Sequence, residues 1–226
     1  MLRFLLPGLL AFSVSSASAH ELDEAEIKRL AVEAIMERPE IILEAISVLQ
    51  QREQQELLAS AVEPGSAPII GDPNAPITII EFFDYNCGFC KRAADVMRPV
   101  LAENPDVRFV MREYPILSPG SVVAARAALA AQEQGKYEEL HWALMEAPRV
   151  TEENTLEIAE ELGLDMVRLR AEMASAQIDE HIQQTRDLAE ALSVTGTPAF
   201  VIGNQLVAGF LDAEQFQELI EEARAN

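Results

Sequence analysis

A strand, a Cys-x-x-Cys pair and a helix follow one another directly in this sequence, and that succession constrains the fold more than any other feature. Cys87 and Cys90 are the only cysteines among 226 residues. The run Ile77–Phe83 before them is apolar and rich in β-branched and aromatic residues, which is typical of a buried strand. Apolar residues recur after the pair at helical spacing, at Ala93, Val96, Met97, Val100 and Leu101. The pattern therefore predicts that the pair lies at the N-terminus of a helix.

This position favours redox chemistry of the two thiols. Free backbone N–H groups and the helix dipole stabilise a thiolate, which is the nucleophilic form of cysteine. Such settings lower a cysteine pKa from about 8.5 to roughly 3.5–7.5. A second cysteine three residues on can close an intramolecular disulfide or resolve a mixed one. We therefore interpret Cys87 as the attacking thiol and Cys90, one turn inside the helix, as the resolving thiol.

Two other interpretations of the pair have less support. A structural zinc site needs about four ligands, and the remaining candidates, His20, His141 and His181, are not paired at ligand spacing. The two later histidines are better explained as packing or surface residues. An inert structural disulfide across so short a loop would constrain the unfolded chain little. We expect neither a metal nor a dissociable cofactor.

Glu81 lies inside the predicted strand that leads into the cysteine pair. With a side-chain period of two, Ile79 and Phe83 share its face, whereas Ile80 and Phe82 take the other. Both faces are apolar, as in a central strand, so a carboxyl group there is costly unless it is protonated or functional. We interpret Glu81 as a buried acid that exchanges protons as the thiols react. The alternative is a glutamate near the strand end that reaches solvent.

Residues 1–19 are typical of a secretory signal peptide. Arg3 supplies the basic start, an apolar run follows, and Ala17-Ser18-Ala19 fits a cleavage site of small residues. The run is too short to span a bilayer, although an uncleaved anchor is the alternative. We expect cleavage after Ala19 and export to an oxidising compartment.

The chain is strongly acidic, with a formal net charge of −21 at pH 7. This balance argues against nucleic acid and anionic membrane surfaces as partners. It is compatible with cationic unfolded substrates, but solubility alone also explains it.

Residues 20–63 are predicted to form a helical segment and a linker. Apolar side chains follow helical spacing on both sides of Pro39, which ends one helix and suits the first turn of the next. They are Ile27, Leu30, Ala31, Ala34 and Ile35 before the proline, and Ile42, Ala45, Ile46 and Leu49 after it. Neither helix can bury this stripe within itself, so both either pack on the rest of the chain or pair with another copy. We favour self-association through residues 20–60.

Residues 64–226 have the pattern of an α/β domain. A strand after the cysteine-bearing helix would pair in parallel with the strand before it, which gives a βαβ unit. Residues 118–192 are helical by pattern, as in an inserted subdomain. The other predicted elements are strands at 69–70, 107–111, 199–202 and 205–208 and a final helix at 212–223.

Together these features resemble the DsbA-like branch of the thioredoxin superfamily. The resemblance rests on the segment from Glu81 to Cys90, the helical block and Gly196-Thr197-Pro198, and it covers residues 64–226. It implies a thioredoxin fold with an inserted all-helical subdomain, preceded here by the helical oligomerisation segment. It also implies a cis-proline at position 198. The residues to which it assigns catalysis are Cys87, Cys90 and Glu81, and those assigned to substrate binding are Gly88, Phe89, Thr197 and Pro198.

The match to DsbA itself is incomplete. DsbA carries Pro-His between its cysteines, whereas Gly88-Phe89 is closer to the Cys-Gly-Tyr-Cys of DsbC-type isomerases, and Thr197 stands where DsbA has Val. The N-terminal helices resemble those of ScsC- and Com1-like proteins, some of which oligomerise through this region. The resemblance implies a periplasmic thiol–disulfide oxidoreductase that isomerises or reduces. The partners it implies are unfolded or misoxidised exported proteins, a membrane redox partner and further copies of the chain.

Other functions stay open at this point. A DsbA-like dithiol oxidase is the alternative among enzymes. A holdase chaperone and a Cu(I)-binding protein that uses both thiolates are the alternatives from another class, since soft thiolates select Cu(I). Refolding of a scrambled protein separates isomerase from oxidase, and retention of anti-aggregation activity without the cysteines would indicate a holdase.

Overall fold

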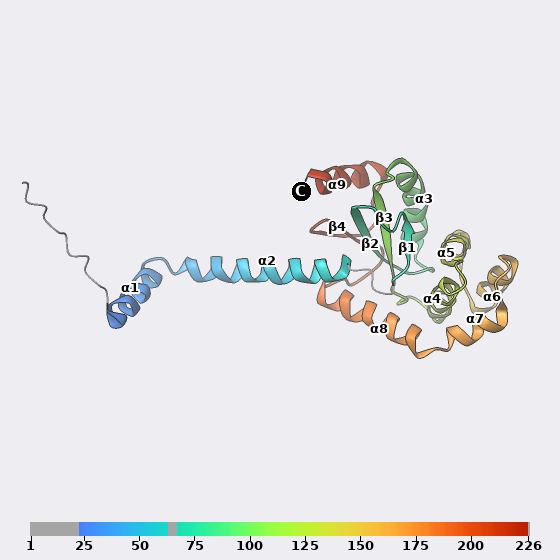
Figure 1. Cartoon of the computed structure of the whole chain (residues 1–226), viewed down its shortest axis with the longest axis horizontal. Coiled ribbons are helices and arrows are strands. Elements are labelled where there is room, and N and C mark those ends of the chain that lie inside the picture. Colours follow the sequence, from blue (N-terminus) through green and yellow to red (C-terminus); the bar gives the residue numbers. More distant parts are fainter. Residues whose placement is uncertain (1–22, 63–66, 226) are drawn as a thin grey trace, which may run out of the picture. The chain divides into compact units, whose positions relative to one another are not determined.

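The computed structural model describes residues 23–62 and 67–225 (Figure 1). The predicted signal peptide, its cleavage site after Ala19 and most of the linker lie outside these ranges. The chain divides into two compact units, Met1–Leu49 and Gln50–Asn226. No helix within the described ranges is both long and apolar enough to cross a membrane.

The first unit is helical, as predicted. It contains α1 (Glu24–Glu37) and the first part of α2 (Glu40–Val62), with the break between them at Arg38 and Pro39. The Asp23 carboxylate caps α1 by accepting a hydrogen bond from the backbone N–H of Glu26 at 2.8 Å. α1 buries none of its residues. The exposed large apolar side chains of this unit are Ile27, Leu30, Val32, Ile35, Met36, Ile41, Ile42, Leu43, Ile46, Val48 and Leu49.

A five-stranded mixed sheet with the strand order β1-β3-β2-β4-β5 forms the centre of the second unit. β2 and β3 pair in parallel, and the other neighbours pair antiparallel. The predicted βαβ unit and C-terminal hairpin are therefore confirmed. β3 is two residues longer than predicted. The strands are β1 (Ile69–Gly71), β2 (Ile77–Phe83), β3 (Val107–Glu113), β4 (Ala199–Ile202) and β5 (Gln205–Ala208).

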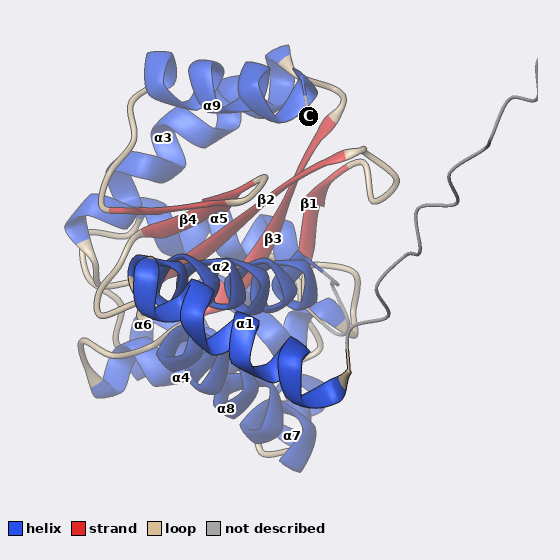
Figure 2. Ribbon diagram, turned by 90° about the vertical axis from the view of Figure 1, so that its left-hand side faces the viewer, coloured by secondary structure: helices blue, strands red, loops and turns tan. Residues whose placement is uncertain are grey.

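Side chains of β2 alternate between two apolar layers, as the sequence predicts. Ile79 and Phe83 pack with the cluster that includes α3 (Gly88–Glu103) and α9 (Ala213–Ala225). Figure 2 shows these two helices on one face of the sheet and α8 on the other. Ile80 and Phe82 belong to the second cluster, which includes α8 residues. All four side chains are fully buried, so β2 is a central strand.

The end of α2 belongs to the second unit. Leu58 is buried in the cluster that holds Ile80 and Phe82. We expect the domain boundary at residues 63 and 64, whereas the two units divide at Leu49 and Gln50, within the helix. The reason is that the polar run after Gln50 ends in apolar residues that pack beside the sheet.

The predicted helical insertion at 118–192 is confirmed as five helices. Side-chain caps mark four of the helix starts, since Ser118, Thr151, Asp165 and Ser175 each accept a backbone N–H. The side chains that α4 buries are Ser121 and a set of alanines and a leucine, so its neighbours approach closely. The helices are α4 (Pro119–Gln132), α5 (Tyr137–Glu146), α6 (Glu152–Glu161), α7 (Met166–Met173) and α8 (Ala176–Ala191).

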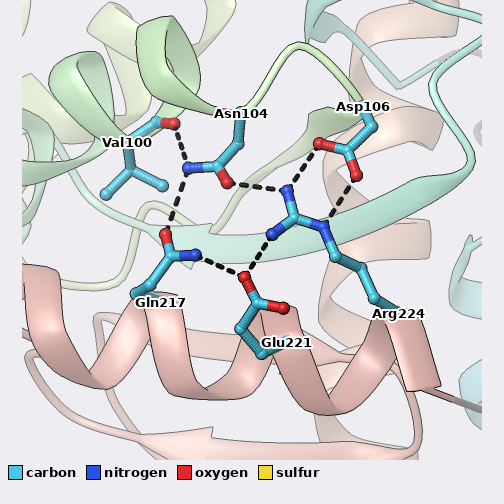
Figure 3. Close-up of polar contacts among 6 residues, drawn as sticks. All are labelled: Val100, Asn104, Asp106, Gln217, Glu221 and Arg224. Atoms are coloured by element: carbon cyan, nitrogen blue, oxygen red, sulfur yellow. Dashed lines mark hydrogen bonds and ion pairs between the residues drawn. The ribbon is translucent and has the colours of Figure 1, made fainter.

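A polar network ties the end of α9 to the turn between α3 and β3 (Figure 3). The Arg224 guanidinium donates to both carboxylate oxygens of Asp106, at 2.7 and 2.8 Å, and to the Asn104 side-chain oxygen at 2.7 Å. It also donates to Glu221 at 2.6 Å, one turn earlier on α9. The hydrogen bond from Arg224 lowers the pKa of Asp106. The network fixes the C-terminal end of α3, the helix that begins beside the cysteine pair.

Candidate functional site

Cys87 is the N-cap residue of α3, and Cys90 lies in the first turn. The backbone N–H of Cys90 donates to the Cys87 sulfur at 3.3 Å, and the backbone N–H of Cys87 donates to the Asp84 carbonyl at 2.9 Å. The predicted position of the pair at a helix N-terminus is therefore confirmed. Both cysteines are free thiols in this structure.

The two thiols differ in acidity. The hydrogen bond from the Cys90 thiol lowers the pKa of Cys87 to about 5, and the Thr197 side chain and two backbone N–H groups lower it further against the effect of burial. Burial raises the pKa of Cys90 far above its ordinary value, and the hydrogen bond to Cys87 adds to the rise. Cys87 keeps 5% of its surface exposed and Cys90 none. At neutral pH the pair is thus a thiolate that keeps a small exposed surface beside a fully buried thiol.

Glu81 is buried, with 1% of its surface exposed, so the solvent-reaching alternative is wrong. Its Oε1 atom has no hydrogen-bond partner within the described part of the chain. Burial raises the pKa of Glu81 well above its ordinary value, and the negative charge of Cys87 raises it further. The carboxyl group therefore holds its proton to a higher pH than an exposed glutamate, and more so while Cys87 is a thiolate. Its role in proton exchange stays a prediction.

The segment before β4 reaches Cys87 from the opposite end of the sequence. The Thr197–Pro198 peptide bond is cis. The Cys87 sulfur lies 3.3 Å from the Thr197 carbonyl oxygen, to which it donates when it is protonated. Both residues of the segment line a surface pocket of about 370 Å³ that extends along Leu206 and Ala208 of β5.

The two residues between the cysteines face solvent. Gly88 is exposed, and Phe89 keeps 54% of its surface exposed. The Arg92 guanidinium lies over the Phe89 ring, 4.3 Å from its centroid, and 5.3 Å from the centroid of Phe210. Gly88 and Phe89 thus border the Cys87 thiolate. Their role in substrate binding stays a prediction.

Sequence reasoning missed several polar residues around the pair. Asp84 is buried, and its carboxylate accepts four hydrogen bonds: from the backbone of Asn86, Ile116 and Leu117 and from the Ser121 hydroxyl, at 2.7–2.9 Å. An aspartate three residues before a helix cap is a signal that sequence reasoning can use, because aspartate often accepts from the chain two residues on.

Lys91, directly after Cys90, was also missed. Its ammonium donates to the carbonyls of Leu144, Met145 and Ala147 at 2.6–3.3 Å. These carbonyls lie at the C-terminal end of α5, where a cation also interacts favourably with the helix dipole. Burial lowers the pKa of Lys91, and the negative charges of the thiols and of Asp84 oppose that effect.

A buried polar cluster lies at the end of β3. The hydroxyls of Tyr85 and Tyr137 donate to the same Glu113 oxygen at 2.9 and 3.0 Å, and Tyr85 also contacts His141 Nδ1 at 3.1 Å. Burial raises the pKa of Glu113 well above its ordinary value. Burial lowers the pKa of His141 to about 3, so the imidazole is neutral. His141 stacks on Tyr137, which agrees with the packing role expected from the sequence.

Known proteins resemble most of this chain. Residues 78–221 match the family model of the DSBA-like thioredoxin domain. A thioredoxin-like oxidoreductase from Silicibacter pomeroyi DSS-3 is 44% identical, with a TM-score of 0.72 over 74% of this chain and 97% of that chain. Proteus mirabilis ScsC in a compact conformation is 25% identical, with a TM-score of 0.68 over 89% and 98% of the two chains.

The curated relatives include much longer proteins. Na(+)/H(+) antiporter NhaA 3 of Salinispora tropica is 32% identical over 168 residues, which are 73% of this chain and 26% of the antiporter. The chain thus spans about a quarter of the length of that relative. The residues matched by the family model include both cysteines and all of α3. This chain therefore belongs to the DsbA-like thioredoxin-domain family of thiol–disulfide oxidoreductases.

Proposed function

We propose that this protein is an exported thiol–disulfide oxidoreductase that acts in the periplasm as a disulfide isomerase or reductase. The observation that carries the proposal is the difference between its two thiols. Cys87 is a thiolate at neutral pH with a small exposed surface, and Cys90 is a fully buried thiol that donates to it. A pair in this state attacks disulfides without further activation.

The first step forms a mixed disulfide. The Cys87 thiolate attacks one sulfur of a substrate disulfide, the substrate S–S bond breaks, and the other substrate sulfur leaves as a thiolate that takes a proton from solvent. Attack removes the negative charge of Cys87. That charge is one of the two causes that raise the pKa of Glu81, so Glu81 becomes more acidic at this point.

Two outcomes follow from the mixed disulfide. In isomerisation, a second thiolate of the substrate attacks the substrate sulfur that is bonded to Cys87. A new substrate disulfide forms, and the Cys87 thiolate is restored with no net change in oxidation state. In reduction, Glu81 first releases its proton to solvent, and the resulting carboxylate accepts the proton of Cys90 as the Cys90 sulfur attacks the Cys87 sulfur. The Cys87–Cys90 disulfide forms, the substrate leaves with two electrons, and a membrane redox partner of the dithiol class must reduce the pair again.

The surroundings of Cys87 suit an extended, unfolded substrate. Thr197 and Pro198 line the pocket beside the thiolate and offer backbone atoms to a peptide. Phe89, Ile116 and Leu117 each keep 43–54% of their surface exposed. Unfolded or misoxidised exported proteins present the apolar side chains that such a surface binds. The acidic chain gives no support to nucleic acid as a partner.

The first unit supports self-association through residues 20–60. α1 buries no residue, and eleven large apolar side chains between Ile27 and Leu49 are exposed. A helix with such a stripe gains most from pairing with a second amphipathic surface. Copies joined in this way hold several Cys87 sites around one substrate, which raises the effective concentration of thiolate and favours isomerisation.

A dithiol oxidase is the second candidate, and one observation favours it. The pKa of Cys87, at about 5, lies between those of about 7 for thioredoxin and about 3.5 for the oxidase DsbA. A stabilised thiolate makes the reduced form more stable and the disulfide form more oxidising. The low pKa of Cys87 is therefore the observation that supports an oxidase.

Refolding separates the two candidates. The reduced full-length protein is incubated with a scrambled protein that has several disulfides, without added oxidant, and the recovery of native activity is followed. An isomerase restores the native pairing, Cys87→Ser abolishes the effect, and Cys90→Ala retains part of it while mixed disulfides accumulate. Recovery only from the fully reduced substrate, by the disulfide form of the protein, would instead establish the oxidase.

A further inference from the structure

The Asn86 side chain, directly before Cys87, pairs with the backbone of a distant residue. Its amide oxygen accepts from the Val150 N–H at 2.9 Å, and its amide nitrogen donates to the Val150 carbonyl at 3.1 Å. The two bonds imitate the pairing between neighbouring strands. A carboxylate lacks the donor and a hydroxyl lacks the reach for this double contact. Asn86 thus fixes the α5–α6 loop of the helical insertion against the cysteine turn.

Two hydroxyls join this pairing to Asp84. The Asn86 amide nitrogen also lies 2.8 Å from the Ser118 hydroxyl and 3.2 Å from the Ser121 hydroxyl. Because the Ser121 hydroxyl donates to Asp84 at 2.7 Å, the Ser118 hydroxyl donates to Ser121 over their 3.0 Å separation. The contacts of Asp84 and Asn86 with these residues form one network, which we call the Asn86 clamp. It comprises Asp84, Asn86, Ser118, Ser121 and Val150.

Gly120 allows the start of α4 to lie close to the backbone of Val150. A Cβ atom at this position would lie 2.4 Å from the Val150 carbonyl oxygen and 3.2 Å from the Thr151 Cα. Both are backbone positions that cannot rotate away. Glycine therefore lets the start of α4 approach the Val150 loop to the distance at which Asn86 reaches both of its polar groups.

The clamp acts on the atoms that stabilise the thiolate. Asn86 is adjacent to Cys87, whose sulfur accepts from the Cys90 N–H at a distance of 3.3 Å, near the upper end of useful hydrogen bonds. A small movement of the 84–87 turn would weaken this bond. The other groups whose charge acts on Cys87, namely Glu81, Cys90 and Lys91, do not belong to the clamp.

We infer that Asn86 is a positioning residue, which uses the helical insertion to hold the Cys87 sulfur against the N-terminus of α3. The insertion thereby sets the reactivity of the attacking thiol, although none of its residues bonds to that sulfur. This inference rests on the proposed thiolate chemistry of Cys87. It does not depend on whether the protein isomerises, reduces or oxidises.

The test is the pH profile of Cys87 alkylation by iodoacetamide in the full-length reduced protein, with the labelled cysteine identified by mass spectrometry. If the Cys87 thiolate loses stabilisation equal to about one hydrogen bond, the pKa of Cys87 rises from about 5 to about 6. For Asn86→Ala we therefore expect alkylation at pH 5 to slow about fivefold, while the rate at pH 8 stays unchanged. A rate lowered equally at both pH values would indicate altered access and would contradict the inference.

A second variant breaks the clamp without touching Asn86. Gly120→Ala pushes the Val150 loop away, so it should shift the profile in the same direction. The double variant should shift it no further than the larger single effect, because both changes remove the same contact. Additive shifts would show that the two positions act separately. If Asn86→Ala does not fold, Ser118→Ala removes one acceptor of the clamp and takes its place.

The matched control is Asn104→Ala, at the other end of the same helix. Asn104 is also buried, and its side chain also bonds a backbone carbonyl and two side chains. It should lower the melting temperature without moving the alkylation profile. If Asn86→Ala behaves in this way too, Asn86 is a structural residue only and the inference is wrong.

Discussion

Both units of this chain have helices with apolar stripes, but the stripes are buried in the second unit and exposed in the first. In the second unit, side chains such as Met97 on α3 and Phe216 on α9 are buried beside the sheet. In the first unit, every large apolar side chain from Ile27 to Leu49 is exposed. A single helix shows both cases, since α2 carries exposed Leu49 and buried Leu58. An apolar stripe thus predicts that a helix has a partner, but it does not identify the partner.

We expect the largest effect from a charge introduced into the apolar stripe of the first unit. Ile46→Asp places a carboxylate in the exposed stripe of α2, where burial between copies would be costly. We expect the full-length protein to change from oligomer to monomer in light scattering and to lose most isomerase activity. Cys87 alkylation should be unaffected.

The matched control for this variant is Gln51→Asp, an exposed change on the opposite face of the same helix that also adds one negative charge. A wild-type protein that is already monomeric would remove the self-association proposal and favour an ordinary monomeric oxidoreductase. A protein truncated to start at Gln50 makes the same comparison and keeps Leu58, which a start near residue 64 would delete.

A pair of leucine substitutions on α2 compares the two units directly. Leu58→Ala should lower the free energy of unfolding by about 2–4 kcal/mol, because it leaves a cavity beside the sheet. Leu49→Ala should change the unfolding of the second unit by less than about 0.5 kcal/mol. Chemical denaturation at two protein concentrations measures both. If both variants lower the free energy of unfolding equally at low protein concentration, Leu49 contributes to the stability of the second unit as much as Leu58 does.

Glu81 makes the stability of the second unit depend on pH, because its carboxyl group is buried there. The first unit buries no such group in α1. Its folded pKa is raised, so the protonated group adds stability below the ordinary carboxyl pKa of about 4.5, and that stability is lost as the pH rises through the raised value. Glu81→Gln should therefore flatten the decline of unfolding free energy with rising pH. It should also slow release of the mixed disulfide by Cys90.

Denaturation curves at several pH values, with Glu113 left intact in both proteins, isolate the contribution of Glu81. Parallel curves for the wild type and the variant would mean that Glu81 has the same pKa folded and unfolded. Unchanged exchange kinetics between about pH 5 and 8, the range in which activated thiols titrate, would exclude the proton-transfer role.

The smallest expected effect is at the surface of the second unit. Arg224→Ala removes the ion pair with Asp106 and the bond to Asn104 (Figure 3). Exposed pairs contribute little and are screened by salt, so we expect a slight fall in melting temperature that shrinks at high ionic strength. Because the pKa of Asp106 is lowered in the folded state, this contribution should vanish as the pH falls through that lowered value. A salt-independent loss would point to packing instead.

Sequence patterns could predict the elements of the fold, but not all of their limits. The alternation in Ile77–Phe83 identifies a central strand because both of its faces are apolar. β3 extends past its apolar part because Arg112 and Glu113 are charged and yet buried, which periodicity cannot reveal. The end of α2 could not be assigned to the second unit from the sequence, because the packing of Leu58 depends on residues far along the chain.

The candidate site was predictable only in part, for a similar reason. Cys87, Cys90 and Glu81 are identified by local spacing and by the strand that carries them. Asn86 has no such signal, because its partners lie 32 to 64 residues further along the sequence. Thr197 could be connected to the pair only through the family resemblance, since 110 residues separate it from Cys87.

The helical insertion joins the sheet through two chain segments, and each contacts the turn from Asp84 to Cys87. The first, after β3, has the amides of Ile116 and Leu117 held by Asp84. The second, before β4, carries the Thr197 carbonyl that contacts Cys87. Both connections of the insertion are therefore bonded to the redox centre. A change in the position of these helices, even one caused by contact with α6 or α7, would be transmitted to Cys87 through both connections.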